Sequence, residues 1–333
     1  MTVTMNAIVA TGYGSPDVFE YQKVEKPKIG ADEILVRVHA TSVTSAHTFI
    51  RTGYPLIGRL FMGLLKPKNA ISGTDFAGEI VAKGKDVTMF FVGDRVFGST
   101  DIDGGTYAEY IKINQHGVIH RIPENLNYAK ASAIIDGATT TFPFLVEQAK
   151  VKEGTRVLIN GASGSIGTAA VQLAKHLGAE VTGVCSTSNV DLVNSLGADY
   201  VIDYTREDFT KGVNKYDVIF DTVGKSSFKQ SKKVLSRNGI YMSPVLGLRM
   251  LVDMIKSSLL SGKKAIFLAT GLRSDEAKLK DFQQLRDLLE KGIISPVIDR
   301  TYQLPQIAEA HKYVEKGHKK GNIVIDVTGE AYD

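Results

Sequence analysis

A glycine-rich turn between an apolar segment and a helical one is the part of the sequence best suited to bind a ligand. It reads Arg156-Val-Leu-Ile-Asn-Gly-Ala-Ser-Gly-Ser-Ile-Gly167 and continues into Thr168–Lys175. Unpaired N–H groups at a helix start, together with the helix dipole, favour the negative charge of a pyrophosphate. Ala162 stands where the pattern G-x-G-x-x-G has its first glycine, and Gly164 and Gly167 fill the other two positions. The turn predicts a dinucleotide site that contains Ala162, Ser163, Gly164, Ser165, Ile166 and Gly167.

Two competing patterns can be tested by their spacing. A P-loop needs a glycine five residues before Gly-Lys-Ser, but Ile219 stands five residues before Gly224. The short-chain dehydrogenases use Tyr-x-x-x-Lys, and no tyrosine in this sequence has a lysine four residues later. Both classes are therefore disfavoured.

The residues after the second predicted strand bear on the choice of cofactor. About 20 residues past the glycine turn, a carboxylate would bind an adenosine 2′-hydroxyl. Ser186, Thr187 and Asn189 lie there instead, with no acid among them. Their small polar groups leave room for a 2′-phosphate, so NADP(H) is favoured over NAD(H). The preceding Cys185 has no basic neighbour and is interpreted as a buried strand residue.

From Tyr128 onward, strands and helices alternate. Helical stretches such as Ala169–Leu177 and Val190–Leu196 separate near-continuous apolar runs. This pattern predicts a parallel sheet covered on both faces, and in that setting a dinucleotide turn is favoured over an ordinary tight turn. The predicted strands are Arg156–Asn160, Glu180–Cys185, Tyr200–Tyr204, Asp217–Asp221, Ile240–Val245 and Ala265–Ala269.

The first 120 or so residues have a different texture. Ile34–His39 alternates in the manner of a half-buried strand, and Phe76–Val81 and Arg95–Gly98 resemble it. This part is expected to be β-rich and antiparallel. The end of the sequence adds helices at Glu276–Glu290 and Ile307–Glu315 and a final strand at Asn322–Val327.

Composition and charge exclude several classes. The 333 residues suggest two domains, and 43% hydrophobic with 23% charged residues is typical of a globular protein. The net charge is +4 without a run of five or six like charges, so no nucleic-acid partner is indicated. One cysteine excludes an intrachain disulfide and a cysteine-based zinc cluster. Charges interrupt Leu246–Leu260, so no membrane span is expected, and the N-terminal residues predict a cytoplasmic protein.

Three stretches together resemble the medium-chain dehydrogenase/reductase superfamily, in its zinc-free quinone oxidoreductase-like branch. They are Gly73–Ile80 with Val92–Phe97, then Asn160–Gly167, then Leu196–Tyr204 with Asp221–Gly224. The resemblance implies an α/β fold: a doubly wound Rossmann domain at 126–270 and a GroES-like β-rich catalytic domain at 1–125 and 271–333. It also implies a homodimer.

The resemblance also bears on metal binding. Thr74-Asp75 stands where zinc-dependent relatives carry a His-Glu pair, and Thr44 stands where they carry a cysteine ligand. A catalytic zinc needs three protein ligands from Cys, His and carboxylate, so no metal site is expected. His47 is interpreted as a hydrogen-bonding residue rather than a ligand or proton relay.

Without zinc, the implied chemistry is hydride transfer from NADPH to an electrophile that needs little activation, such as a quinone or an α,β-unsaturated carbonyl compound. Tyr54 and Thr44 match residues that line the substrate site of relatives, and either could donate a hydrogen bond to the developing oxyanion; Tyr54 could equally be a turn residue. The resemblance implies further cofactor contacts from Thr140, Tyr204, Val223, Leu246, Leu268 and Ala269.

Two questions stay open at this stage. The apolar stretch Tyr54–Pro67 fits a core helix and a lid over a hydrophobic substrate equally well. The alternatives to a quinone or enone reductase are an enoyl-thioester or ketone reductase and a non-catalytic NADPH-binding structural or interaction protein, because a fold does not determine a reaction.

Overall fold

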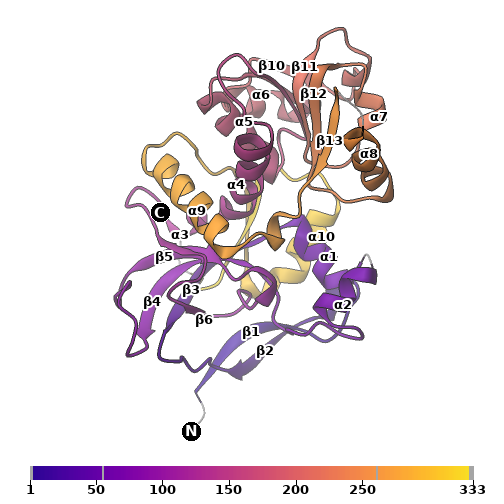
Figure 1. The fold of residues 1–333 in the computed structure, drawn as a ribbon. Helices are drawn as coiled ribbons and strands as arrows, with labels where there is room; N and C mark the ends of the chain where they lie inside the picture. The colour runs from indigo at the N-terminus through magenta and orange to yellow at the C-terminus, as the bar shows by residue number, and fades with distance from the viewer. Residues whose placement is uncertain (1–2, 55, 260–261, 330–333) are drawn as a thin grey trace. The chain divides into compact units, whose positions relative to one another are not determined.

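Two units of different architecture make up the chain (Figure 1). The structure is a computed structural model that describes residues 3–54, 56–259 and 262–329. The β-rich unit comprises Met1–Asp136, Ser274–Glu290 and Pro296–Asp333. The α/β unit comprises Gly137–Arg273 and Lys291–Ser295. Segments from both ends of the sequence therefore build the β-rich unit.

The α/β unit contains a parallel sheet whose described strands follow the order β10-β9-β8-β11-β12-β13. The chain starts in the middle at β8, adds two strands on one side and then three on the other. This is the order of a doubly wound Rossmann sheet. The strands are β8 (Arg156–Asn160), β9 (Glu180–Cys185), β10 (Tyr200–Asp203), β11 (Tyr216–Asp221), β12 (Leu235–Ser243) and β13 (Lys264–Phe267).

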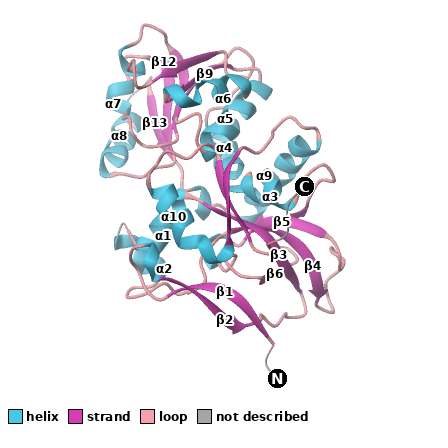
Figure 2. Cartoon of the chain, turned by 180° about the vertical axis from the view of Figure 1, so that it is seen from behind, coloured by secondary structure: helices cyan, strands magenta, loops and turns pink. Residues whose placement is uncertain are grey.

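Helices lie on both sides of this sheet (Figure 2). The side chains of Val157, Leu158 and Ile159 in the central strand are fully buried, as expected for a strand covered on both faces. The helices are α4 (Ile135–Phe142), which continues as a π-helix over Pro143–Gln148, α5 (Ser165–His176), α6 (Val190–Ser195), α7 (Phe228–Ser231) and α8 (Leu248–Ser258).

The β-rich unit is mainly antiparallel. Its larger sheet follows the order β14-β15-β3-β4-β5-β7, with β6 also paired to β3, and β1 pairs separately with β2. Only β14 and β15 pair in parallel among the described strands of this unit. The strands are β1 (Thr4–Ala10), β2 (Phe19–Glu25), β3 (Glu33–Val43), β4 (Asp75–Lys83), β5 (Arg95–Ser99), β6 (Tyr110–Asn114), β7 (Ile119–Arg121), β14 (Ile298–Gln303) and β15 (Asn322–Asp326).

The C-terminal strand closes this unit because β15 pairs antiparallel with β3. Buried Ile323, Val324 and Ile325 of β15 join the core around it. The helices of the unit are α1 (Ser45–Thr52), α2 (Arg59–Met62), α3 (Tyr128–Ala133), α9 (Asp275–Glu290) and α10 (Ile307–Glu315).

The predicted fold class is confirmed, and β8, β9 and α10 have the predicted bounds. Two strands differ. β12 begins at Leu235 rather than Ile240, because its polar residues Ser236–Gly239 interrupt the apolar pattern and coincide with a register shift. β13 ends at Phe267, so Leu268 and Ala269 follow the strand. No helix in the described part of the chain is long and apolar enough to cross a membrane.

The end of β11 is held by a buried carboxylate. Asp221 is fully buried, and its Oδ1 accepts hydrogen bonds from the Asn160 Nδ2 and the Gly224 backbone N–H at 2.9 and 3.0 Å. Its Oδ2 accepts from the Ser226 N–H at 2.9 Å and from the Tyr241 hydroxyl at 2.8 Å. Asp221 therefore connects β8, β11 and β12 and orders the loop that follows β11.

We expect Asp221→Asn to lower the free energy of unfolding by about 3 kcal/mol, because an amide NH₂ cannot accept the hydrogen bonds that one carboxylate oxygen accepts and leaves buried donors unpaired. The exposed Asp208→Asn should cost less than about 1 kcal/mol. Urea denaturation of both variants measures the difference. Equal losses would contradict the bracing role of Asp221.

Candidate functional site

The turn after β8 depends on a glycine that lies one residue before the motif position considered in the sequence. Gly161 has φ +84°, in the left-handed region that favours glycine. A Cβ at Gly161 would lie 2.7 Å from Thr222 Oγ1 and from Val223 Cγ1. Gly161 thus makes the tight turn that the first glycine of the motif usually makes, and Ala162 follows it with its methyl group buried.

The other two glycines differ in their surroundings. Gly167 lies in the first turn of α5, and a Cβ there would meet the Gly161 carbonyl oxygen at 2.0 Å. Gly164 is the N-cap of α5. Because it has no side chain, no side-chain hydrogen bond caps the helix there. Among the described residues, a Cβ on Gly164 would have only the Gly161 oxygen within 4 Å, at 3.5 Å. The N-terminus of α5 is therefore open at Gly164, and a phosphate group could approach its backbone closely there.

The remaining residues of the turn are held from neighbouring elements. Ser163 is buried, and its Oγ accepts a hydrogen bond from Asn189 Nδ2 at 2.9 Å. Ser165 is also buried, while Ile166 is partly exposed. The structure thus brings Asn189, predicted near the adenosine, against the glycine turn.

The end of β9 lies beside a carboxylate that the local sequence does not contain. Thr187 Oγ1 donates to Asp203 Oδ2 of β10 at 2.5 Å. This hydrogen bond, followed by those from Thr205, lowers the pKa of Asp203. Arg206 Nε lies 3.3 Å from the same carboxylate and balances its charge. Sequence reasoning missed Asp203 and Arg206 because they belong to the next strand and its turn.

The other predicted cofactor residues follow the carboxyl ends of the parallel strands or lie in α4. Tyr204 follows β10 and is exposed, with its N–H bonded to the Cys185 carbonyl at 3.0 Å. Val223 follows β11, and it and Leu246, which follows β12, are exposed. All of these residues lie at the edge where open α/β sheets bind ligands. Partly exposed Leu268 and Ala269 follow β13, and buried Thr140 lies in α4.

Cys185, the last residue of β9, is 1% exposed. Burial raises the pKa of its thiol to about 11. The thiol is therefore protonated near neutral pH, and its interpretation as a buried strand residue is confirmed.

In the β-rich unit, the two candidate catalytic residues lie at opposite ends of α1. Thr44 is the N-cap, and Tyr54 follows the left-handed C-cap Gly53. The eight-residue helix between them is about 12 Å long. Thr44 is buried, and its Oγ1 has no hydrogen-bond partner among the described residues, whereas Tyr54 is 64% exposed. The structure does not bring the two side chains together.

A polar cluster, made of His47, Arg51, Tyr107 and His311, holds α1 in the β-rich unit. His47 and Arg51 are the two buried residues of α1. The Thr44 N–H donates to His47 Nδ1 at 3.2 Å, and the Tyr107 hydroxyl lies 2.9 Å from the same nitrogen. Because Nδ1 accepts, Nε2 carries the proton and donates to Thr74 Oγ1 at 2.9 Å. His311 Nε2 lies 3.2 Å from the Tyr107 hydroxyl.

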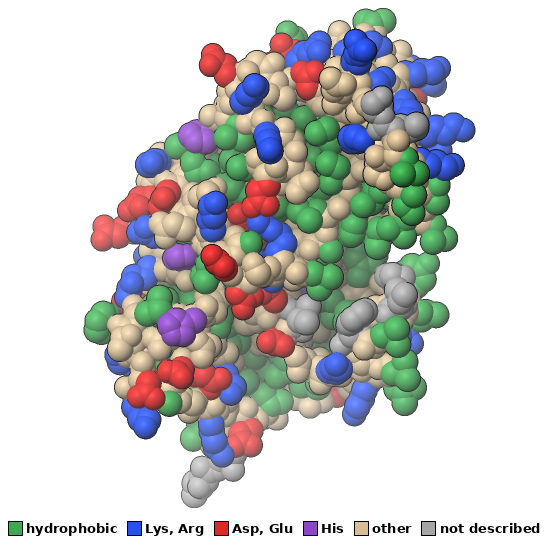
Figure 3. All heavy atoms as spheres, in the orientation of Figure 1, with side chains coloured by type: hydrophobic (Ala, Val, Ile, Leu, Met, Phe, Trp, Pro, Cys, Tyr) green, Lys and Arg blue, Asp and Glu red, His purple; other side chains and the backbone are tan. Residues whose placement is uncertain are grey.

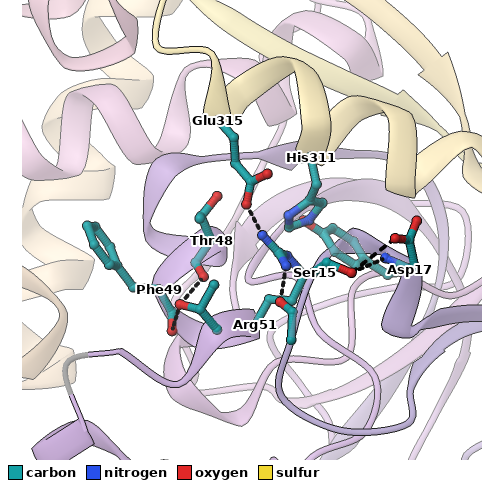
Figure 4. A network of polar contacts seen from close by, with 10 residues as sticks. Ser15, Asp17, Thr48, Phe49, Arg51, His311 and Glu315 are labelled. Carbon is teal, nitrogen blue, oxygen red and sulfur yellow. Dashed lines mark hydrogen bonds and ion pairs between the residues drawn. The ribbon is translucent and has the colours of Figure 1, made fainter.

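Arg51 extends this polar cluster (Figure 4). Its guanidinium donates to the Gly14 carbonyl and to Glu315 of α10, next to His311. Burial lowers the pKa of His47 to about 4 and that of His311 still further. Both imidazoles are neutral near pH 7. The interpretation of His47 as a hydrogen-bonding residue is confirmed.

Asp75 is a buried residue of β4 and is linked to this cluster through Thr74, which bonds to His47. Its Oδ2 accepts from the Ser42 hydroxyl at 2.8 Å, and its Oδ1 accepts from the Thr74 hydroxyl at 3.1 Å. Burial, together with the charge of Asp136, raises the pKa of Asp75 to about 7. Within the described part of the chain, no group of three His, Cys, Asp or Glu side chains is arranged to hold a metal ion.

The apolar stretch after α1 is not a core helix. Leu56, Leu60, Leu64 and Leu65 are all more than 60% exposed. Arg59 connects this stretch to the end of α1, because its Nε donates a hydrogen bond to the Gly53 carbonyl oxygen at 3.1 Å. Pro55 and the side chains of Ile57 and Phe61 lie outside what the structure describes. The exposed leucines contradict the core-helix interpretation, and the lid over a hydrophobic substrate stays a prediction.

Comparisons with known proteins match both parts of the chain. The description "Alcohol dehydrogenase GroES-like domain" covers residues 30–124, and "Zinc-binding dehydrogenase" covers residues 196–325. The chain is 31% identical to the quinone oxidoreductase of Pongo abelii, over 94% of each chain. It is 30% identical to the 2-methylene-furan-3-one reductase of Solanum lycopersicum, over 96% of this chain and 79% of that one.

Solved structures agree. The quinone oxidoreductase of Coxiella burnetii superposes with a TM-score of 0.86 at 28% identity, over 98% of this chain and 100% of that one. The two-unit fold, the glycine turn and these likenesses lead to one assignment. The chain belongs to the medium-chain dehydrogenase/reductase superfamily, in its quinone oxidoreductase-like group, and is an oxidoreductase that uses a nicotinamide cofactor.

Proposed function

We propose that the protein reduces quinones or α,β-unsaturated carbonyl compounds with NADPH and without zinc. The observation that carries this proposal is the open N-terminus of α5 at Gly164, at the carboxyl edge of a Rossmann sheet. The acceptor class is supported by the names of the relatives from Pongo abelii and Solanum lycopersicum. When bound, the nicotinamide supplies the hydride, and the protein binds, orients and shields the reactants.

The residues around the open turn fit the cofactor. The backbone of Ser163–Gly167 would hold the pyrophosphate, because Gly164 leaves space and the α5 amides face a negative charge favourably. The other contacts that we propose come from Thr140, Ala162, Ser186, Thr187, Asn189, Tyr204, Val223, Leu246, Leu268 and Ala269.

NADPH is proposed over NADH on the groups near Ser186 and Thr187. Asp203 alone would repel a 2′-phosphate. However, Arg206 balances the charge of the Asp203 carboxylate, and the Thr187 hydroxyl donates a hydrogen bond to Asp203 Oδ2. The guanidinium of Arg206 is 75% exposed, so it can also pair with a phosphate.

Catalysis without zinc is proposed on the chemistry of the side chains in the β-rich unit. Thr44 and Thr74 offer hydroxyls where a zinc site would need a thiolate and an imidazole. Thr44 is the favoured donor to the developing oxyanion, because its buried hydroxyl has no partner in the described structure and His47 fixes its backbone. Tyr54, beside the exposed leucines, is better placed to contact an apolar substrate.

The domain limits, the oligomeric state and the location of the protein are also proposals. We propose the domain limits 1–125 with 271–333 and 126–270, a homodimer, and a cytoplasmic location. The limits lie near the boundaries of the two units, at Asp136–Gly137 and Arg273–Ser274, and the homodimer is what the resemblance implies.

Gly164→Val should keep the stability of the protein, since φ is −82° and the added Cβ has space. It should weaken NADPH binding about 100-fold, because one or two charge-assisted hydrogen bonds to the pyrophosphate, each about 1.5–3 kcal/mol, would be lost. Fluorescence titration with NADPH and NADH checks both affinities, and wild-type protein should bind NADPH more tightly. Gly12→Val, at another open glycine, is the control. Unchanged affinity in Gly164→Val would show that the turn does not bind the cofactor.

Thr44→Val should lower kcat about 100-fold and leave NADPH affinity unchanged, because it removes a donor to the oxyanion and retains the shape of the side chain. Thr48→Val removes another buried hydroxyl of α1 that has no partner among the described residues, and it should leave kcat unchanged. Steady-state kinetics with a quinone and an enone measure both variants. If Thr44→Val were as active as wild type, another group would have to donate the hydrogen bond to the oxyanion.

A chelator should leave the reduction of a quinone by NADPH unchanged, since no step is assigned to a metal. Metal analysis of the purified protein provides the second measurement. A stoichiometric zinc ion, or loss of activity that zinc restores, would refute the zinc-free mechanism. If NADPH binds but no quinone or enone is reduced, the non-catalytic alternative applies.

A further inference from the structure

A groove of about 650 Å³ lies in the β-rich unit, between α9 and the segments next to β7. Leu279, Lys280, Gln283 and Arg286 of α9 line one side of it. Residues of β7, of the loop after β4 and of the turn before β7 line the rest. A volume of this size is ordinary for a small-molecule site. The glycine turn belongs to the other unit, so the groove is not part of the proposed cofactor site.

Hydrogen bonds hold the loop after β4 in place beside the groove. The Oε1 of buried Gln115 accepts from the backbone N–H groups of Thr88 and Met89 at 2.9 and 3.2 Å. Arg121 Nη2 donates to the Met89 carbonyl at 2.8 Å, and Arg121 Nε donates to the Asp94 carboxylate at 3.0 Å. The groove is therefore preformed, which lowers the entropic cost of binding a ligand.

Part of the groove lining is apolar. Phe90 and Ile119 are among the lining residues and are almost fully buried. Met89, from the loop after β4, is 49% exposed, and Leu279 of α9 is half-buried. The apolar surface that these two side chains leave accessible can be covered favourably by an alkyl or aryl group.

The charged side chains that line the groove are all basic. No Asp or Glu occurs among the lining residues in the described part of the chain. Lys280 is exposed and has no ion pair within that part. The carboxylate oxygens of Glu290 and Asp287 lie 3.6 and 3.8 Å from nitrogens of Arg286, too far for hydrogen bonds. The N–H groups of Arg286 are therefore available to an anion.

The excess of basic groups is confined to the groove. Figure 3, which has the orientation of Figure 1, shows charged side chains of both signs on the surface around the position of α9. A nucleic acid needs a continuous basic surface, so it fits less well than a small anion. A divalent cation also fits less well, because His116 and His120 line the groove beside cationic groups and without a carboxylate. The lining thus favours a small anion with an apolar body.

We propose that this groove binds a small amphipathic anion, in which a carboxylate or phosphate group is attached to an alkyl or aryl body. Arg286 and Lys280 bind the anionic group, and the planar guanidinium offers it two parallel N–H donors. The apolar body lies along Met89 and Leu279. This site does not depend on the proposed reaction.

Calorimetric titration of the full-length protein in the presence of NADPH tests the proposal. We expect decanoate and decyl phosphate to bind at one site per chain, and the difference between them shows which anionic group is preferred. Decanol and decyltrimethylammonium, which have the same alkyl chain without the negative charge, should not bind. From hexanoate to decanoate the affinity should rise about threefold for each CH₂, because each methylene buries more apolar surface.

The basic part is tested by Lys280→Gln with Arg286→Gln. This double variant should bind decanoate about 30-fold more weakly, because it loses charge-assisted hydrogen bonds. Neither residue is buried, so the unfolding temperature should stay unchanged. Lys316→Gln with Arg237→Gln, at an exposed lysine and an exposed arginine elsewhere, is the control and should bind as wild type does.

The apolar part is tested by Met89→Gln, which should weaken decanoate binding about fivefold. Val92→Gln, at an exposed residue outside the groove lining, should bind as wild type does. Equal affinity of the Lys280→Gln, Arg286→Gln variant and wild type, or no binding of either anion, would overturn the proposal. So would equal binding of decanoate and decyltrimethylammonium, or binding of polyglutamate in place of decanoate, which would assign the groove to an acidic protein segment.

Discussion

The contact between the first turn of α5 and the Gly161 carbonyl is the constraint on which the proposed cofactor site depends. No side chain fits at Gly167, because even a Cβ would meet that oxygen at 2.0 Å. The helix therefore starts directly after the turn that follows β8, and the space at Gly164 stays open. Asp221 holds the neighbouring strand end by its hydrogen bonds, so that the loop beside the turn is also ordered. The turn is thus closely packed at Gly167 and open at Gly164.

The β-rich unit uses a different kind of interaction to position its candidate residue. Helix α1 is fixed by buried polar groups, since His47 and Arg51 are its buried side chains. A buried polar network is favourable only when its members are paired. Tyr107 joins the two histidines, and His47 reaches back to the backbone of Thr44. These hydrogen bonds hold α1 in the β-rich unit, while Arg51 Nε, His311 Nδ1 and the Thr44 hydroxyl have no partner among the described residues.

The charge of the α/β unit is unevenly distributed along its sequence. The glycine turn lies in a segment of mixed charge, whereas the segment from Thr222 to Lys264 is strongly basic. A total charge of +4 conceals this asymmetry because the rest of the chain compensates for it.

The sequence by itself determined the alternation of strands and helices, the bounds of β8, β9 and α10, and the glycine turn. These features depend on neighbours within a few residues, namely apolar runs and helix-start geometry. Only the tertiary structure decided which glycine makes the tight turn, that Asp203 and Arg206 stand beside Thr187, that Thr44 and Tyr54 lie apart, and that a groove lies between α9 and β7. Each of these depends on residues far apart in the chain, whose approach is fixed by strand order and packing and leaves no local pattern.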